Sequence, residues 1–536
     1  MKNLYKFFGV MLLTGLTLSA FAQETRIVKV NGWDPASGED IESFNDVLYK
    51  AVETDSTARK TNPNVIFELT RGHYYPQGKT IQNFDFKLHI RAADGSGMLP
   101  VITPGKRANG TYGADYIYAY NDITLENIEV NGHTPDGGVL NRMIEARGNN
   151  SRYVVKGCSY SGDRGSLIVA NADSLKIYLY DSKFGNSGHR KTAGGNGRPI
   201  DFRPAALYLD TLVMRNCTNY NVTDRIIRNM GTRVNYLVFD HNTTTNNKGY
   251  HGALQLGMVN YAKVTNNIFA NTISLGHVDS RTQEQTQPEK HFSVISLDSI
   301  FEDQTIIVRN NNIYTDQSIQ DVWAKYDSVS APYEITQTIK NAIGESNVAS
   351  AWYAEPLTFK TLCGAFPDYV DAWYLNPTAS EFPDDWCVGG DGGYFPDEID
   401  ASYGTNAISY TKADGGFPVG DLNYYPEKKA EWEAWLPTAV RGFVNSGTEV
   451  KVYPNPFSDR VKMVVNTNKA EQIEISIFDV NGKMINQVAK QHVSQGVHEY
   501  WWDGKNPNGN KVNTGIYMYK VVTSTDIQTG SLVLIK

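Results

Sequence analysis

The amino-acid sequence predicts an all-β protein that consists of a parallel β-helix, a short N-terminal helix and a C-terminal β-sandwich. Three observations support this prediction. Hydrophobic strands followed by Asn-rich turns recur through the middle of the chain, an amphipathic helical pattern precedes them, and strands separated by NG-type and PNG turns end the chain. With 536 residues, 41% of them hydrophobic and 20% charged, the chain is globular and long enough for more than one domain.

The charge and the aromatic content narrow the function. The net charge of −8 argues against non-specific binding to nucleic acids, which are polyanions. The 32 tyrosines and 9 tryptophans suit a protein that stacks rings on sugars, although tyrosine also fills β-sheet positions. The sequence contains no HExxH, CxxC, GxSxG or P-loop motif, which disfavours zinc hydrolases, serine hydrolases and nucleotide enzymes.

The N-terminus has the pattern of a secretory signal peptide. Lys2 and Lys6 precede an apolar run over 7–21, and Ala20-Phe21-Ala22 supplies a small-x-small cleavage site. Beyond this run no segment approaches the ~18–20 apolar residues that span a bilayer. We therefore expect residues 1–22 to be removed and the mature protein to be exported without a membrane span.

The segment 43–56 reads as one amphipathic helix. Ser43 is a plausible N-cap for it. One helical face carries the apolar residues Phe44, Val47, Leu48, Ala51 and Val52.

Seven later segments repeat a hydrophobic strand followed by an Asn-rich turn. They are 123–130, 153–160, 176–184, 211–220, 235–244, 262–270 and 305–315. The matching turn positions, 24 to 45 residues apart, are Asn127, Cys158, Ser182, Cys217, Asn242, Asn267 and Asn312. Such a repeat, with no amphipathic helix between strands, predicts a parallel β-helix in which each rung covers the core of its neighbour. Asn side chains stacked at the ~4.8 Å strand spacing would hydrogen-bond from rung to rung.

The helix is followed by two strand-rich stretches and then by NNI-type rungs. The stretches read NVIFELTRGHYYPQGKTI and KLHIRAADGSGMLPVITPG. In this order, over roughly residues 40–320, the chain resembles the pectin-lyase-like superfamily of right-handed parallel β-helix proteins. The resemblance implies a right-handed coil over 23–320 that is capped by the helix, since an uncovered end would expose core and unpaired backbone. It also implies one of the superfamily's activities: polysaccharide lyase, glycoside hydrolase, esterase or non-catalytic adhesin.

The stacking of rungs predicts whether two of the four cysteines form a disulfide or remain free thiols. Cys158 and Cys217 occupy one column two rungs apart, which places their Cα atoms ~10 Å from each other. A disulfide needs a Cα separation below ~7 Å, so we predict two buried free thiols. Cys363 and Cys387 could form one disulfide in an oxidising compartment.

Residues 321–445 lose the repeat and read as an irregular extension that packs on the last rungs. A separate small domain is the alternative, and a helix at the end of 421–435 would cap the coil. An acidic, glycine-rich loop is a candidate Ca²⁺ site, because carboxylate and carbonyl oxygens suit a hard cation, or else a solvated acidic loop. Its aspartates are Asp384, Asp385, Asp391 and Asp397.

Residues 446–536 read as a separate β-sandwich of about seven strands. They contain Tyr453-Pro454-Asn455-Pro456-Phe457, Phe478-Asp479-Val480-Asn481-Gly482-Lys483, Gly515-Ile516-Tyr517-Met518-Tyr519-Lys520 and the terminal Lys536. In this combination the unit resembles the type A sorting domain of the type IX secretion system of Bacteroidetes. The resemblance implies outer-membrane translocation, removal of the domain, and release or anchoring at the cell surface. The alternative is a permanent carbohydrate-binding sandwich.

A second strand aligns across five rungs and gives the candidate site. Its inward positions are Ile144, Ile168, Ile200, Ile227 and Leu254. Because side chains alternate along a strand, the residue after each of these points outward. The outward column is Glu145, Val169, Asp201, Arg228 and Gln255. A parallel column holds Arg147, Asn171 and Arg203.

We predict a glycan groove on this face. A lyase that acts on uronates removes a proton α to a carboxylate, so it needs a base and positive charge for that carboxylate. Arg203 or Arg228 would bind the carboxylate, and His251 or Lys248 would be the base. The predicted substrate-binding residues are Asp201, Gln255, His189, Arg190 and Lys191. The alternative is an ordinary charged sheet face, on which an ion pair contributes only ~0–1 kcal/mol.

Two functions follow. The first is a secreted or cell-surface polysaccharide-active protein, most simply a lyase acting on acidic glycans, and the second is a non-catalytic glycan-binding or adhesive β-helix. Glycoside hydrolysis needs paired carboxyl groups ~5–9.5 Å apart, and no second carboxylate aligns beside Asp201. We expect a monomer whose partners are polysaccharide and the type IX machinery, with no nucleic acid and no metal assigned to the groove.

Overall fold

The computed structural model describes two compact units of the chain. The described residues are 24–113, 115–134, 139–188, 197–203, 208–229, 231–249, 251–278, 288–301, 304–327, 329–362, 366–375, 399–436, 449–467, 470–479, 484–523 and 527–535. One unit is Thr25–Trp435 and the other contains Leu436–Lys536.

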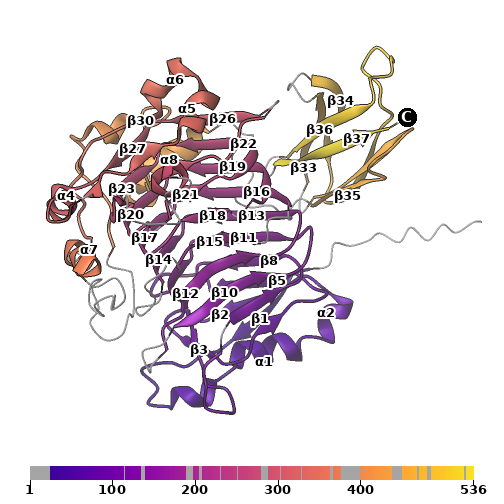
Figure 1. Cartoon of the computed structure of the whole chain (residues 1–536). Coiled ribbons are helices and arrows are strands. Elements are labelled where there is room, and N and C mark those ends of the chain that lie inside the picture. The colour runs from indigo at the N-terminus through magenta and orange to yellow at the C-terminus, as the bar shows by residue number, and fades with distance from the viewer. Residues whose placement is uncertain are drawn as a thin grey trace, which may run out of the picture. The chain divides into compact units, whose positions relative to one another are not determined.

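The first unit is a right-handed parallel β-helix, as predicted, with strands stacked into three sheets (Figure 1). Sheet 1 contains β1 (Arg26–Val30), β2 (Val65–Leu69), β5 (Leu88–Ala92), β8 (Ile123–Glu126), β11 (Arg152–Lys156), β13 (Leu175–Tyr180), β16 (Tyr208–Arg215), β19 (Arg233–Asp240), β22 (Met258–Thr265) and β26 (Thr305–Arg309). Sheet 2 contains β3 (Tyr74–Gln77), β6 (Val101–Pro104), β9 (Glu129–Asn131), β12 (Ser159–Ala170), β14 (Lys183–Ser187), β17 (Thr218–Val222), β20 (Thr243–Asn247), β23 (Ile268–Thr272), β27 (Asn311–Tyr314) and β30 (Trp352–Tyr353).

Sheet 3 carries the candidate site. It contains β4 (Ile81–Gln82), β7 (Asp115–Ala119), β10 (Leu140–Ala146), the second half of β12, β15 (Ile200–Phe202), β18 (Ile227–Asn229), β21 (Leu254–Gln255), β25 (Ser293–Ser296) and β29 (Tyr333–Ile335). β24 (His277–Val278) and β28 (Val329–Ser330) form a short antiparallel ribbon. The apolar side chains of all three sheets fill one continuous core inside the coil.

The turn from sheet 1 to sheet 2 explains the repeated asparagines. In seven successive rungs one residue has a positive φ between 51° and 63°, a conformation that Gly, Asn, Asp and His tolerate better than other residues. These residues are Asn127, Gly157, Asp181, Asn216, His241, Asn266 and Asn310. The residue after each of them points into the coil. Backbone conformation therefore restricts the first residue of the turn, and hydrogen bonding inside the coil restricts the second.

The inward residues after this turn form the predicted ladder. At its two ends the register differs from the predicted one. The strand pairing gives the column Ile128, Cys158, Ser182, Cys217, Asn242, Asn267 and Asn311. The prediction of Asn127 and Asn312 in this column is therefore wrong by one residue at each end. In the ladder, Asn267 Nδ2 donates to Asn311 Oδ1 over 2.9 Å, and Asn242 N donates to Asn267 Oδ1 over 2.8 Å.

The N-terminal end of the coil is covered by α1 (Val47–Thr54), which buries Leu48 and Val52. The helix is shorter than the predicted 43–56, and Ser43 is not its N-cap. Ser43 belongs instead to a separate 3-10 turn, η1 (Ile41–Phe44), whose cap is Asp40. Asp46 interrupts the two because its carboxylate accepts hydrogen bonds from Gly78 N and Lys79 N, both 2.8 Å long. A further short helix, α2 (Ala58–Thr61), follows.

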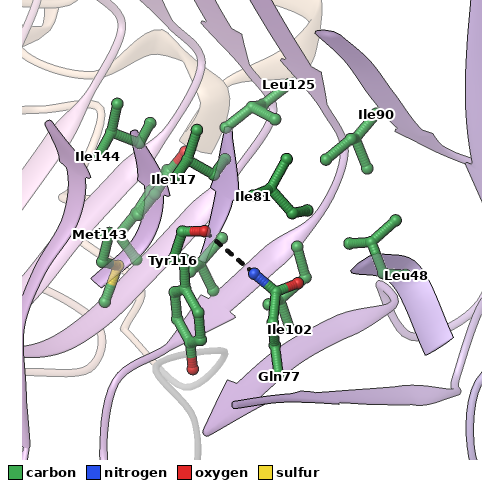
Figure 2. Close-up of a pocket in the computed structure, with 12 residues that line it drawn as sticks. Leu48, Gln77, Ile81, Ile90, Ile102, Tyr116, Ile117, Leu125, Met143 and Ile144 are labelled. Carbon is green, nitrogen blue, oxygen red and sulfur yellow. Dashed lines mark hydrogen bonds between the residues drawn. The ribbon is translucent and has the colours of Figure 1, made fainter. Parts of the chain in front are cut away.

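Figure 2 shows the coil interior beneath this cap. Leu48 faces the aliphatic side chains of sheets 1 and 3, and Gln77 Nε2 donates to Tyr116 O over 3.1 Å. The cavity among these side chains has a volume of about 10 Å³, which is the room for about one water molecule. The cap therefore packs against the first rungs at the density of an ordinary protein core.

The opposite end of the coil is covered by α5 (Gln337–Ile343) and α6 (Glu345–Ala351), which lie against β26 (Figure 1). Their buried residues Ile339 and Ala351 join the core of the coil. The strands β29 and β30 pair with earlier rungs, so the coil continues past residue 320, where the sequence predicts its end. The repeat is hidden there because the helices interrupt it.

The segment 421–435 does contain a helix, α8 (Pro426–Trp435), but this helix does not cap the coil. Its Trp432 packs on the ladder turn, with ring centroids 5.0 Å from His241. The residues just before α8 contact the same side of the coil. For example, Thr218 Oγ1 donates a hydrogen bond to Asp421 Oδ2 over 2.7 Å. The other elements of this unit are α3 (Pro288–Phe292), α4 (Gln317–Trp323), α7 (Phe366–Leu375), η3 (Ile408–Thr411) and η4 (Leu422–Tyr424).

The second unit is an antiparallel sandwich of seven strands, as predicted. One sheet has the order β31 (Glu449–Tyr453), β32 (Val461–Thr467) and β35 (Gly496–Trp502). The other has the order β34 (Met484–Val493), β33 (Glu471–Asp479), β36 (Gly515–Val522) and β37 (Ile527–Leu534). Inward residues alternate along each strand, and Val461, Ile475 and Trp502 lie in its core.

Cys158 and Cys217 are buried free thiols, as predicted from their spacing. Burial raises the pKa of the Cys158 thiol to about 12. Cys363 and Cys387, the other predicted pair, lie outside the described residues. Among the described helices none is long and apolar enough to cross a membrane.

Candidate functional site

The register predicted for sheet 3 is confirmed by the strand pairing. Glu145 pairs with Val169, Val169 with Asp201, and Asp201 with Arg228. The inward column from Ile144 to Leu254 is buried in the core. The residues of the outward column therefore project from the outer face of sheet 3, as the alternation of a strand requires.

Asp201 is the centre of this face and is fully buried. Its carboxylate accepts from Arg203 Nε over 2.6 Å and from Arg228 Nε over 2.6 Å. Arg198 Nη1 and Ser166 Oγ add longer contacts of 3.4 and 3.2 Å. Arg228 on β18, Arg203 immediately after β15 and the loop residue Arg198 thus share a single carboxylate.

Asp224 is a second fully buried carboxylate next to the first. Arg198 Nη2 lies 2.9 Å from Asp224 Oδ2, Arg225 Nε lies 3.1 Å from it, and His251 Nδ1 lies 2.9 Å from Oδ1. Desolvation alone would raise the pKa of Asp224, but the nearby Arg225, His251 and Arg198 outweigh it and lower that pKa well below its usual range. Asp224 therefore stays ionised and holds the His251 ring by a charge-assisted hydrogen bond.

We call these residues the arginine cluster: Arg198, Arg203, Arg225, Arg228, Asp201, Asp224 and His251. In the described residues, four guanidinium groups pair with two carboxylates, an excess of two formal positive charges among these six groups. This surplus is notable in a chain whose net charge is −8. The cluster is therefore a patch of positive formal charge on an acidic protein.

The predicted site residues differ in how far solvent reaches them. The Arg203 side chain is 43% exposed, Arg228 is 14% exposed and His251 is 15% exposed, so a ligand can reach these three. Lys248 is only 1% exposed, so its amine is not presented as a surface base.

Asp201 and Gln255 were predicted to bind substrate, but both are covered. Gln255 is 1% exposed, and its Oε1 accepts from Arg225 Nη1 over 2.9 Å while its Nε2 donates to His251 O over 3.2 Å. Both side chains position the cationic groups of the cluster instead of contacting a ligand. The other predicted groove residues, His189, Arg190 and Lys191, lie outside the described residues.

Sequence reasoning did not single out Asp224, Arg225, Arg198 or His291. His291 lies beside His251 with ring centroids 5.9 Å apart, and desolvation, with the nearby cations, lowers the pKa of His291 to about 4. This ring is therefore neutral near pH 7. The available signal was the pair Asp224-Arg225, which immediately precedes an aligned strand of sheet 3.

The same face of sheet 3 carries a second polar group nearer the N-terminal end. Glu145 accepts from Arg147 Nη2 over 2.9 Å, and Arg142 lies 3.2 Å from it. The Arg147 guanidinium also lies 3.5 Å from the centroid of the Tyr118 ring. Charged and aromatic groups therefore continue along sheet 3 from the arginine cluster towards α1.

Within the described residues, no three His, Cys, Asp or Glu side chains come together as a metal site. The aspartates predicted to hold Ca²⁺, Asp384, Asp385, Asp391 and Asp397, lie outside these residues. The site as described is thus a parallel β-helix surface with a preorganised cluster of arginines and one reachable histidine.

Comparisons with known proteins found one family model and several solved structures that are similar to parts of the chain. The C-terminal unit matches the FlgD Ig-like domain family over residues 452–526. The crystal structure of pectate lyase Pel9A covers 74% of this chain and 96% of that chain, at 11% identity and a TM-score of 0.36. The crystal structure of dimeric latent PorU from Porphyromonas gingivalis covers 18% of this chain at 18% identity and a TM-score of 0.16, and the match spans 10% of that chain. No curated protein matches the chain.

Proposed function

We propose that the protein binds acidic polysaccharides on the outer face of sheet 3 and cleaves them by β-elimination at the arginine cluster. One observation carries the proposal: in the part of the chain that the structure describes, four arginines and a histidine contact two carboxylates on one face of the coil. A guanidinium fork matches a carboxylate in shape and charge, so a uronate unit is the natural ligand for this surplus.

The chemistry uses groups that a ligand can reach. Arg203 and Arg228 bind the uronate carboxylate and stabilise the negative charge that develops when its α-carbon loses a proton. Asp224 accepts a hydrogen bond from His251 Nδ1, which leaves Nε2 as the basic nitrogen of the ring. His251 Nε2 takes the proton and a carbon–carbon double bond forms. The bond between the β-carbon and the glycosidic oxygen breaks, and this oxygen takes up a proton from water.

A second candidate function is glycan binding without cleavage. It is favoured by the high exposure of Arg203, which suits a contact surface, whereas His251 is mostly covered. In that case Arg203 and Arg228 would bind uronates, and the His251–Asp224 pair would only hold Arg225 and Gln255 in place.

A substrate screen distinguishes the two functions. Purified protein is incubated with pectate, alginate and chondroitin, and the ultraviolet absorbance of unsaturated uronates is followed. If the lyase proposal holds, one substrate gives a rising signal, and His251→Ala lowers kcat by about 10²–10⁴-fold with binding retained. Arg228→Ala is expected to lower kcat/KM.

Arg233→Ala serves as the matched control, because Arg233 is exposed on sheet 1, where it contacts Asn260 and the Phe301 ring and not the arginine cluster. Its activity should equal that of the unmodified protein. Binding without any absorbance change on all three substrates would support the non-catalytic function. Absence of binding to every acidic polysaccharide would overturn both.

We also propose that the chain is exported through the type IX system, with residues 1–22 as signal peptide and the C-terminal sandwich as sorting domain. Support comes from the sequence motifs of 446–536 and from the independent folding core of this unit. Deletion of 446–536 in a Bacteroidetes host should leave the protein inside the cell envelope, as measured by immunoblots of cell fractions. The full chain expressed in a strain without the system is the control, and secretion of the truncated protein would contradict the proposal.

A further inference from the structure

A second cavity lies at the N-terminal end of sheet 3, apart from the arginine cluster. It is open to solvent, has a volume of about 490 Å³ and is bounded by the start of α1, the β3–β4 turn and the segment after β6. This volume lies in the range of small-molecule pockets. The cavity is lined by Asp46, Tyr49, Gly78, Lys79, Thr80, Gln82, Arg107, Ala108 and Tyr118.

Two cationic side chains of this cavity have no carboxylate partner in the described part of the chain. Arg107 donates only to the backbone, from Nε to Gly78 O over 3.2 Å. Lys79 Nζ lies 5.0 Å from the centroid of the Tyr49 ring. Both residues are exposed, so their charges are available to a ligand from solution.

The only carboxylate that lines the cavity is already committed to the protein. Asp46 Oδ1 accepts from Gly78 N and Lys79 N, which fixes the turn that presents Lys79. The turn is also held by close packing, since a Cβ atom at Gly78 would lie 2.7 Å from Lys106 O. The hydrogen bonds of Asp46 and the packing at Gly78 therefore fix the backbone of the turn beside the two cations.

An exposed aromatic platform lies next to the cavity. Phe84 is 62% exposed, and its ring stacks on Tyr120 with centroids 4.3 Å apart. Phe84 and Tyr120 lie two residues beyond Gln82 and Tyr118, which line the cavity and pair across β4 and β7. An apolar ring face beside a cationic, hydrogen-bonding cavity suits a sugar ring that carries an acidic group.

We propose that this cavity, with the Phe84–Tyr120 platform, is a separate binding site for an anionic sugar unit. Lys79 and Arg107 bind the acidic group, Gln82 and Tyr49 hydrogen-bond hydroxyl groups, and Phe84 packs on the ring. None of these residues belongs to the arginine cluster, so binding at this site does not depend on whether the protein cleaves its ligand. Tyr118 lies three rungs from Asp201, about 14 Å at the strand spacing, so one acidic polysaccharide chain can contact both sites.

The test measures binding in full-length protein that carries Arg203→Ala and Arg228→Ala, so that the arginine cluster contributes little. An oligogalacturonate and the matching neutral galactose oligomer are titrated by calorimetry. The acidic oligomer is expected to bind and the neutral one to bind at least about 10-fold more weakly. Adding Lys79→Ala and Arg107→Ala should weaken acidic-oligomer binding by about 10-fold or more.

Two further variants sharpen the result. Phe84→Ala should weaken binding several-fold without changing the thermal unfolding temperature, because the ring is exposed. Lys29→Ala removes an exposed cation of β1 outside the cavity and should change nothing. The proposal is overturned if the Lys79 and Arg107 variants bind as before, if the neutral oligomer binds equally well, or if inorganic phosphate competes at equal concentration.

Discussion

Replacing Asp224 with alanine is expected to lower the free energy of unfolding of the β-helix by about 3–5 kcal/mol. The Asp224 side chain is fully buried, and the Arg198 side chain beside it is only 2% exposed. Without Asp224, Arg198 loses its 2.9 Å ion pair and keeps the 3.4 Å contact to Asp201, so the charge of a buried guanidinium is less well compensated. Arg225 and His251 lose their acidic partner as well.

The loss can be measured by guanidinium unfolding of the full chain, with the transition of the C-terminal unit as an internal reference. Asp371→Ala is the matched control, because Asp371 pairs with Lys325 at the surface and such pairs contribute about 0–1 kcal/mol. Equal stabilities of the two variants would show that the cluster does not depend on this carboxylate.

The pH dependence provides an independent check of the same prediction. Because the pKa of Asp224 is lowered in the folded state, its stabilisation is fully present above the unfolded value of about 4 and is lost as the pH falls below it. The stability difference between the unmodified protein and Asp224→Ala should therefore shrink below about pH 4. A difference that grows on acidification would contradict the assignment.

Replacing Asn267 with alanine is expected to cost about 2–4 kcal/mol of unfolding free energy. Asn267 Nδ2 donates to Phe239 O and to Asn311 Oδ1, each over 2.9 Å, and its Oδ1 accepts from Asn242 N over 2.8 Å. Removal of the amide leaves these buried polar groups without their partner, and a dry interior supplies no replacement.

Asn260→Ala is the matched control for the ladder. Asn260 Nδ2 donates to Asn235 Oδ1 over 3.0 Å, one rung away, but this stack lies on the partly exposed outer face of sheet 1, where water replaces a lost bond. We expect its cost to stay below about 1 kcal/mol. Similar losses at positions 267 and 260 in chemical unfolding would mean that the inner ladder has no special role.

The coil was predictable because its rungs obey two local rules at once. Alternation places Ile144 and Leu254 inside, and a positive-φ turn demands Asn, Asp, Gly or His before each ladder residue. The same turn explains the register errors. Asparagine is favoured both at the strained position and at the ladder position, so a run such as 310–312 fits the pattern in more than one way.

The candidate site was only partly predictable. Strand residues such as Asp201 and Arg228 follow the alternation, and their register was right. Asp224 and Arg198 come from loops between rungs, where no periodicity relates one residue to the next. The burial of Gln255 could not be predicted, because an outward direction on a strand does not determine what covers the side chain. Lys248 follows the end of β20, where strand alternation gives no direction for its side chain.

The helices at the two ends also determine how long the coil is. Each rung offers its backbone N–H and C=O groups to the next, so the repeat itself contains no instruction to stop. At α5 and α6 the next element is no longer a strand, since a helix satisfies its own backbone and presents apolar side chains such as Ile339, Ile343 and Ala351 to the coil core. The order of elements along the chain, and not the strength of the stacking, therefore sets the number of rungs in the coil.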